Sequence, residues 1–241
     1  MLEIRETERI YKLPRKNLYK DGYRPLDFLI NENKLFKAQE KEHLKILIAP
    51  TWGENNILNH CINELLVNLL NEEYEIYLRP HPMTLRNDYH QIKKIKQSFL
   101  RYKNFFLQED QNNRDILFES DLMITDWSGI GMEYGLGLLK PVLYIDVPKK
   151  NLNPEYKKID IAPIEVTIRN EIGRVIDIND LCSINAIIGE MTNVCKRNNL
   201  MKARNKYVFM KRNALNKSAK KIIKLANANA TRAKNNTWQR D

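Results

Sequence analysis

The stretch Ser120–Asp146, SDLMITDWSGIGMEYGLGLLKPVLYID, decides the fold that we expect for this chain. It contains an apolar run (residues 122–124), the polar cluster TDWSG (125–129), a helical segment and a second apolar run (142–145). This order of strand, polar turn, helix and strand is typical of a βαβ unit. Its helix begins just past the carboxyl end of the first strand, where unpaired N–H groups and the helix dipole favour an anion. We therefore expect this turn to hold the diphosphate of an activated donor.

The same alternation of strand and helix continues on both sides of this unit. The expected strands are apolar along their whole length, which is typical of a parallel sheet covered by helices on both faces. We therefore expect an α/β fold: a Rossmann-like open parallel sheet with helices on both faces, followed by a C-terminal helical basic extension. Further strands are expected at 44–49, 74–78, 105–107 and 172–176, and helices at 57–70, 87–102, 113–119, 181–198 and 201–225.

We expect three parts along the chain. Residues 1–42 are highly charged and are interpreted as a linker or N-terminal remnant; their one compact phrase, GYRPLD, indicates a turn that leads into a short helix. Residues 43–180 are expected to form the Rossmann-like nucleotide-donor-binding domain. Residues 181–241 are expected to form C-terminal helices and a basic tail, whose low-complexity end (226–241) should lack regular structure.

The composition fits a folded protein of one large domain, with 241 residues, 43% of them hydrophobic and 29% charged. There is no run of eighteen apolar residues, and the N-terminus lacks the apolar core of a signal peptide, so we expect a cytoplasmic protein. Cys61, Cys182 and Cys195 form no C-x-x-C pair, which favours reduced thiols over a disulfide framework or a zinc site.

The formal net charge is +10, and the basic residues gather towards the C-terminus. From Met201 onward, Asp241 is the only acid among many Lys and Arg residues. Such an end could attract nucleic acid, anionic lipid or an anionic polymer, or could simply be a solvated helix face with a frayed tail. The chain lacks an aromatic-basic platform or a recognised nucleic-acid motif, so nucleic-acid binding is disfavoured.

Polar clusters follow three of the expected strands, at the point where each strand ends. They are Thr51–Trp52, Arg79–His81 and Thr125–Gly129. Because the carboxyl ends of parallel strands meet at one edge of an open sheet, we expect these clusters to converge on one ligand crevice. Thr51 and Trp52 would line it, with the indole as a flat apolar wall, although Trp52 fits a core position equally well.

His81 is the residue that we expect to act in catalysis. It lies in the phrase RPHP, where the prolines on both sides restrict the backbone and fix the direction of the imidazole. The ring could donate to a phosphate oxygen or transfer a proton, and the structural alternative is a bond to a loop carbonyl. Arg79 extends to the same side, where it could pair with a phosphate or with an acid such as Asp126.

Asp126, Ser128 and Gly129 form the turn before the central helix. Ser128 and the N–H groups near Gly129 could bind phosphate oxygens, or Asp126 or Ser128 could cap the helix; the two roles are compatible. Glu133, in the first turns of the helix, could accept hydrogen bonds from both hydroxyls of a nucleotide ribose. The alternative is an exposed glutamate that the helix dipole favours.

The helix after this turn contains two glycines, Gly135 and Gly137. Each glycine inside a helix costs about 1 kcal/mol relative to alanine. Close approach of the helix to the sheet or to a ligand would explain them, and a locally broken helix is the alternative.

Four motifs occur in order along the chain: APTW (49–52), RPHP (79–82), SDLMITDWSGI (120–130) and KPVLYID (140–146). Together they resemble the CDP-glycerol glycerophosphotransferase family, the teichoic-acid-type glycerol-phosphate polymerases and primases. GYRPLD also resembles the linker phrase of that family. The resemblance runs from about Gly22 to Arg174. It implies the C-terminal, donor-binding half of a two-domain GT-B fold, with no obligatory metal and no cofactor.

By this resemblance, His81 matches the histidine that contacts the donor diphosphate. Asp126, Ser128 and Gly129 match the family's D-x-S-S phosphate turn, with Gly129 in place of the second serine; this removes a hydroxyl donor but keeps the backbone N–H. Glu133 aligns with the acidic residue of the following helix, for which a ribose role is reasonable.

The chain departs from the family at its N-terminus. The family's N-terminal domain carries the acceptor site and a second histidine, usually assigned as the general base, and residues 1–42 are too few to supply that domain. We therefore expect this chain alone to bind the donor without efficient transfer. A partner chain, a homo-oligomer that shares sites or a truncated gene would each explain the difference.

The expected activity is transfer of glycerol phosphate, or a related polyol phosphate, from a CDP-linked donor such as CDP-glycerol to a cell-surface glycan or lipid-linked acceptor. The basic tail would suit peripheral contact with the inner face of the plasma membrane. Two alternatives remain open: a GT-B glycosyltransferase that uses a nucleotide sugar, and a non-catalytic nucleotide-binding remnant or subunit.

Overall fold

The computed structural model describes residues 2–19, 22–37, 40–149, 153, 155–193, 197–209 and 218–228. Within these residues, one six-stranded sheet has the order β3-β2-β1-β4-β5-β6, and all neighbouring strands are parallel. This confirms the expected Rossmann-like open parallel sheet. The strands are β1 (Leu44–Ile48), β2 (Tyr74–Leu78), β3 (Phe105–Leu107), β4 (Leu122–Thr125), β5 (Val142–Ile145) and β6 (Gly173–Ile176).

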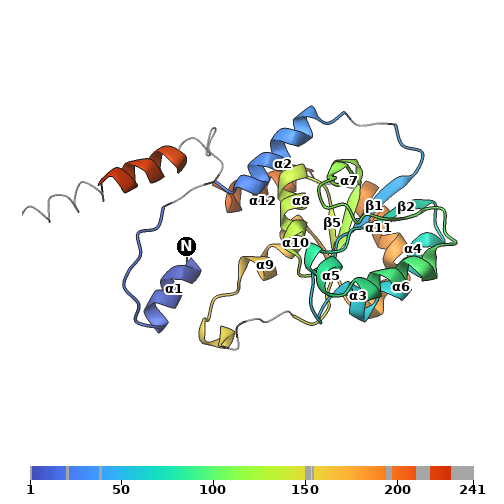
Figure 1. Cartoon of the computed structure of the whole chain (residues 1–241), viewed down its shortest axis with the longest axis horizontal. Helices are drawn as coiled ribbons and strands as arrows, with labels where there is room; N and C mark the ends of the chain where they lie inside the picture. Colours follow the sequence, from blue (N-terminus) through green and yellow to red (C-terminus); the bar gives the residue numbers. More distant parts are fainter. Residues whose placement is uncertain are drawn as a thin grey trace, which may run out of the picture.

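Helices connect the strands and cover both faces of the sheet (Figure 1). Two helices that the sequence predicts as continuous are split in the structure. The 57–70 helix is interrupted at Cys61, whose φ of −153° leaves the helical region, and the 201–225 helix ends at Tyr207, before the separate helix of residues 218–228. The 87–102 helix is one helix that begins at Tyr89 and ends at Phe99. The helices are α1 (Leu2–Ile10), α2 (Arg24–Leu35), α3 (Ile57–His60), α4 (Ile62–Leu70), α5 (Pro82–Asn87), α6 (Tyr89–Phe99), α7 (Asp115–Glu119), α8 (Gly129–Leu138), α9 (Ile164–Thr167), α10 (Arg169–Ile172), α11 (Ile184–Asn193) and α12 (Arg197–Tyr207), with short 3-10 turns η1 (Tyr156–Lys158) and η2 (Ile178–Ser183).

The sheet separates two hydrophobic cores. Ile46 and Ile48 of β1 pack on the face that α3, α4, α6 and α11 cover, whereas Leu47 packs on the face of α2, α7, α8, α10 and α12. This alternation follows from the pleat of a strand, in which successive side chains point to opposite faces. Both faces are apolar because both are covered, and this explains why the strands are apolar along their length.

Helix α2 is part of the packed body, although the sequence places it in a linker that ends at residue 42. Leu26 and Leu29 are only 1% and 6% exposed and contribute to the core beneath α8. Gly137 of α8 permits this contact, because a Cβ atom there would stand 3.1 Å from Cδ1 of Leu26. Close approach, and not a broken helix, therefore accounts for this glycine, since α8 is continuous from Gly129 to Leu138.

Packing also crosses the boundary that we expect at residue 180. Leu181, Ile184 and Ile188 are fully buried in the core on the α4 face. On the other face, Arg204 of α12 donates to the backbone carbonyls of Leu136 and Gly137 near the end of α8. A cation is favourable there because the carbonyls at a helix C-terminus lack partners and carry partial negative charge.

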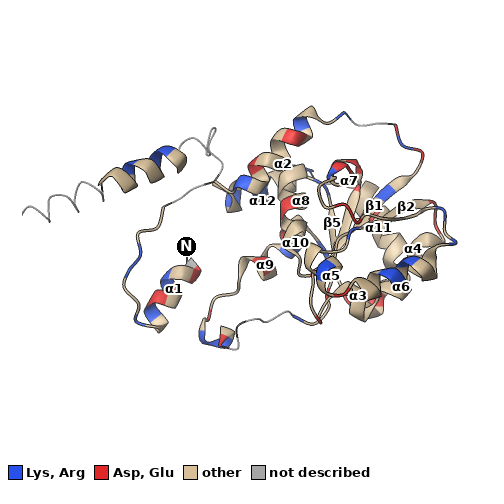
Figure 2. Ribbon diagram, in the orientation of Figure 1, with Lys and Arg blue, Asp and Glu red and all other residues tan. Residues whose placement is uncertain are grey.

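The basic C-terminal extension is described only in part. Residues 218–228 are helical, and Figure 2 shows lysines along this helix. Its apolar residues Ile222 and Ile223 are 60% and 58% exposed. We expect the tail from residue 226 onward to lack regular structure, but residues 226–228 are helical. The rest of the tail, residues 229–241, lies outside the described residues. In the described part of the chain, no helix has the length and apolar character to cross a bilayer.

We predict that Gly131→Ala destabilises the protein by about 1–3 kcal/mol, the usual cost of overpacking a core. A Cβ atom at Gly131 would stand 2.8 Å from Cγ2 of the buried Thr125 and 3.0 Å from the Tyr144 hydroxyl. Urea unfolding measures the change. Gly189→Ala in α11 is the matched control, because its Cβ meets nothing within 4 Å and should stabilise by about 0.5–1 kcal/mol. Equal stability of the two variants would contradict this packing.

Candidate donor-binding site

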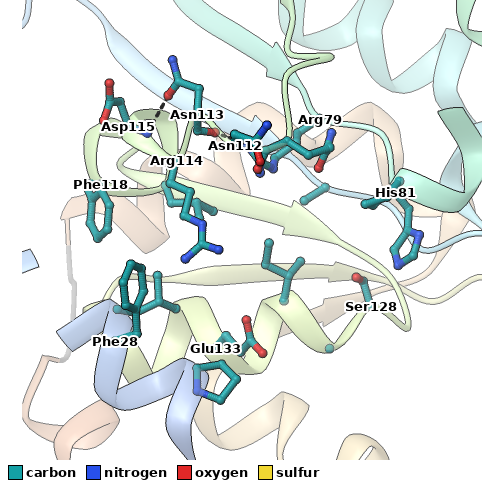
Figure 3. A pocket seen from close by; sticks show the side chains of 18 of the residues that line it. Phe28, Arg79, His81, Asn112, Asn113, Arg114, Asp115, Phe118, Ser128 and Glu133 are labelled. Carbon is teal, nitrogen blue, oxygen red and sulfur yellow. Dashed lines mark hydrogen bonds between the residues drawn. The ribbon is translucent and has the colours of Figure 1, made fainter. Parts of the chain in front are cut away.

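A cavity of about 1060 Å³ lies at the carboxyl ends of the central strands (Figure 3). Ala49–Pro50 after β1, Arg79–Pro82 after β2 and Ser128–Ile130 after β4 line one side of it, and residues of α2 and α7 line the other. Strand β1 pairs with both β2 and β4, so the direction of strand succession reverses here. In open α/β sheets, such a switch point is where ligands bind.

Asp126 fastens the loops at this switch point. It is 1% exposed, and its two carboxylate oxygens accept from the backbone N–H groups of Thr51 (2.8 Å) and Ile57 (2.9 Å). Burial raises the pKa of this carboxyl, and the N–H groups of Ile57 and Thr51 oppose the rise. Both oxygens are thus used inside the protein. The sequence groups Asp126 with the donor-binding residues, but the structure gives it the task of joining the loops after β1 and β4.

Thr51 and Trp52 differ from the position that the sequence indicates, because neither lines the large cavity. Thr51 is buried, and its backbone N–H is the group that Asp126 binds. Trp52 is half-buried, with its ring centre 6.2 Å from that of His81 and the ring planes tilted by 35°. Trp52 is therefore a neighbour of His81 and not a wall of this cavity.

His81 does line the cavity, at the end that also contains Ser128 (Figure 3). It is the N-cap of α5, where Nδ1 accepts from the backbone N–H of Met83 at 3.1 Å. A neutral imidazole has one donor and one acceptor nitrogen, so this contact assigns the proton to Nε2. The flanking prolines and the cap together fix the ring and leave Nε2 as its hydrogen-bond donor.

Arg79 is buried, and its guanidinium donates to the backbone carbonyls of Asn113 (2.6 Å) and Gln111 (2.9 Å). It therefore holds the loop between β3 and α7 and does not pair with Asp126, one of the two partners that the sequence leaves open. In the described part of the chain, no carboxylate lies within ion-pair distance of it. Burial, and then the nearby charge of Arg114, lowers the pKa of this guanidinium.

The start of α8 faces the cavity with backbone N–H groups. Ser128 occupies the N-cap position, and its side chain makes no capping hydrogen bond. A Cβ atom built on Gly129 would meet nothing within 4 Å, so there is open space beside the first turn. An anion in this space would find the positive end of the α8 dipole and unpaired donors, as the sequence predicts for this turn.

Glu133 lines the same cavity one turn further along α8. Its carboxylate accepts from the hydroxyl of Tyr23 at 2.7 Å, although 110 residues separate the two along the chain. Glu133 is therefore a bound carboxylate at the cavity wall, and not the fully solvated helix residue of the alternative interpretation.

Arg114 and Phe118 are among the lining residues that sequence reasoning missed. Arg114, the residue before α7, points into the cavity from the wall opposite Glu133 (Figure 3), with its guanidinium carbon 4.8 Å from the ring centre of Phe28 in α2. Phe118 of α7 lines the same end. The polar run QEDQNNR before α7 was the available signal for Arg114.

The cavity can recognise an anion and a polyhydroxyl group side by side. Three arginines (Arg24, Arg79 and Arg114) and three acids (Glu32, Asp115 and Glu133) line it. Hydrogen-bond donors, namely His81 and the start of α8, gather at one end. Among the described residues, no group of three or more His, Cys, Asp or Glu side chains could hold a metal ion.

At the sequence level, both comparisons with known proteins match enzymes that act on glycerol phosphate. A family model described as CDP-Glycerol:Poly(glycerophosphate) glycerophosphotransferase matches residues 3–151. The teichoic acid glycerol-phosphate primase of Bacillus subtilis (strain 168) is 26% identical over 120 residues, which are 47% of this chain and 29% of the primase.

Solved structures with a similar chain trace include the wall teichoic acid polymerase TagF, with a TM-score of 0.44 and 15% identity over 87% of this chain and 48% of the polymerase. MurG of Acinetobacter baumannii has a TM-score of 0.46 and 13% identity, over 88% of this chain and 57% of MurG. The glycosyltransferase SnogD of Streptomyces nogalater has a TM-score of 0.47 and 12% identity, over 78% and 46%. The chain thus spans less than two thirds of the length of each of these relatives.

We predict that Asp126→Asn destabilises the protein by about 1–3 kcal/mol, because an amide NH2 replaces one of the two oxygens and leaves a buried N–H without an acceptor. Chemical unfolding measures this change. Asp177→Asn is the matched control: Asp177 accepts from the N–H of Asn179 on the surface, where asparagine caps equally well and the change should stay within about 0.5 kcal/mol. An Asp126→Asn variant as stable as the control would contradict the bridging role.

Proposed function

Because this chain belongs to the CDP-glycerol:poly(glycerophosphate) glycerophosphotransferase family, we propose that it supplies the donor-binding half of such a transferase. The donor would be CDP-glycerol or a related CDP-linked polyol phosphate. The observation that carries the proposal is the convergence of His81, Ser128 and the start of α8 on one cavity at the switch point of the sheet. The description of the family names this donor, and one solved structure of TagF was obtained with CDPG.

The donor would lie along the cavity with its diphosphate at the end formed by His81 and the first turn of α8. The N–H groups there supply hydrogen bonds and the dipole supplies positive potential. The ribose would then lie near Glu133, whose carboxylate can accept from its hydroxyls. The base would reach the end formed by Phe28 and Arg114, where a ring and a guanidinium offer flat surfaces for stacking.

In the proposed reaction, an acceptor hydroxyl oxygen forms a bond to the β-phosphorus of the donor. The bond from that phosphorus to the bridging oxygen breaks, and CMP leaves with the electron pair. The Nε2–H of His81 would stabilise or protonate the leaving phosphate, and preorganised N–H donors of α8 would stabilise the charge that develops. No metal takes part in this scheme.

The proton of the acceptor hydroxyl goes to a base that we place outside this cavity, in a second domain or a partner chain. A homo-oligomer would also bring a second set of residues to the acceptor side. The acceptor is proposed to be a cell-surface glycan or lipid-linked molecule. The basic C-terminal segment would then hold the chain peripherally at the inner, anionic face of the plasma membrane, on the cytoplasmic side.

A transferase that uses a nucleotide sugar is the alternative, because its donor presents the same diphosphate to the start of α8. Calorimetric titration of the purified chain with CDP-glycerol, CMP and UDP-sugars separates the two. The proposal predicts binding of CDP-glycerol and CMP. Binding of UDP-sugars alone would favour the alternative, and no binding of CDP-glycerol or CMP would contradict the proposed donor.

We predict that His81→Ala lowers the transfer rate by about 100-fold or more and weakens CDP-glycerol binding by about tenfold. The rate falls because the variant lacks a positioned proton donor, and the affinity falls because it lacks one hydrogen bond to a charged group. Transfer is measured together with the second domain or partner chain that supplies the acceptor-side base, and binding is measured by calorimetry on this chain alone, with circular dichroism as a check on folding. His90→Ala is the control, because His90 is an exposed residue of α6 outside the cavity. A His81→Ala variant that keeps both properties of the wild type would refute this role.

A further inference from the structure

The phrase GYRPLD, which precedes the first strand, forms a wall of the donor cavity. Arg24, Pro25 and Phe28 line that cavity directly. Tyr23 lies at the start of the same helix and reaches α8, where its hydroxyl donates to Oε1 of Glu133 at 2.7 Å. The proposed function assigns no task to Tyr23.

The backbone holds Tyr23 firmly in place. Its carbonyl accepts from the N–H groups of Leu26 (3.1 Å) and Asp27 (3.2 Å), which makes Tyr23 the N-cap of α2. Leu26 and Leu29 then anchor the helix in the core against α8, where Gly137 permits close packing. The two residues of the pair are therefore attached to helices that are packed against each other.

Chemistry fixes the direction of the hydrogen bond. The contact with Glu133, followed by partial burial, raises the pKa of Tyr23 to about 12. The phenol thus remains the donor of this hydrogen bond throughout the neutral range. A carboxylate offers about four acceptor sites on its two oxygens, so the bond to Tyr23 leaves capacity for hydroxyl groups of a ligand.

Holding Glu133 in advance changes what ligand binding costs. A glutamate on a helix surface has several accessible rotamers, and a ligand that binds only one of them loses the conformational entropy of the others. The bond to Tyr23 selects one rotamer before the ligand arrives, which strengthens binding by preorganisation. The effect applies only to ligand groups that contact the Glu133 carboxylate.

We propose that Tyr23 is a positioning residue of the donor site, which holds the Glu133 carboxylate ready for the ribose hydroxyls and so favours ribonucleotides over 2′-deoxyribonucleotides. This inference rests on the proposed function. It makes the segment before the first strand a determinant of donor specificity, with a ribonucleotide as the substrate class.

The test compares CMP with 2′-deoxy-CMP by calorimetry on the whole chain. Wild type should prefer CMP, and Tyr23→Phe should weaken CMP binding by about five- to tenfold, the value of one hydrogen bond at such a site. The affinity for 2′-deoxy-CMP should fall by a smaller factor, because only its 3′-hydroxyl remains to contact Glu133. Tyr11→Phe is a closely matched control, because the Tyr11 hydroxyl donates to Glu155 at 2.6 Å on a surface outside the cavity.

A double-mutant cycle separates positioning from a structural effect. In a Glu133→Gln background, Tyr23→Phe should cause little further loss of CMP affinity, because both changes act on the same contact. A folded Tyr23→Phe variant with the CMP preference of wild type would overturn the inference alone. Failure of wild type to bind CMP would overturn the proposed function and this inference with it.

Discussion

The carboxylate of Asp126 is the constraint on which the cavity depends. It lies after β4 and binds N–H groups of the loop after β1 and of the start of α3, so two neighbouring strand ends are held at one spacing. The Thr125 hydroxyl, which donates to the Ala49 carbonyl at 2.6 Å, reinforces the same junction. A buried carboxylate is tolerated only when its oxygens are satisfied. Both oxygens are engaged by backbone N–H groups, so the carboxylate joins the two loops directly. The start of α8 follows this junction and faces open space at Gly129.

The residues of the candidate site thus have two different tasks: some hold the loops in place, and others face the cavity. Asp126 and Arg79 are buried and bind backbone groups, the first at the β1–β4 junction and the second in the loop before α7. His81 and Ser128 face the cavity from the positions that these contacts fix. Preorganised donors of this kind are effective because they need no rearrangement when charge develops.

The sheet was predictable from sequence because each strand is a short apolar run that ends in a polar cluster. The convergence of His81, Ser128 and Glu133 followed from the same rule. Contacts between distant segments were not predictable. The Tyr23–Glu133 bond depends on how α2 packs on α8, and the placement of Arg114 depends on the loop that Arg79 holds. The helix break at Cys61 was also missed, because no glycine or proline in residues 57–70 marks it.

The central claim is that a donor diphosphate binds at the first turn of α8, beside His81. A crystal structure of the chain with CDP-glycerol or CMP soaked in tests it most directly. The account predicts phosphate density within hydrogen-bond distance of the backbone N–H groups at Gly129 and of Nε2 of His81, with the ribose next to Glu133. Nucleotide density elsewhere on the molecule, with this cavity empty, would contradict it.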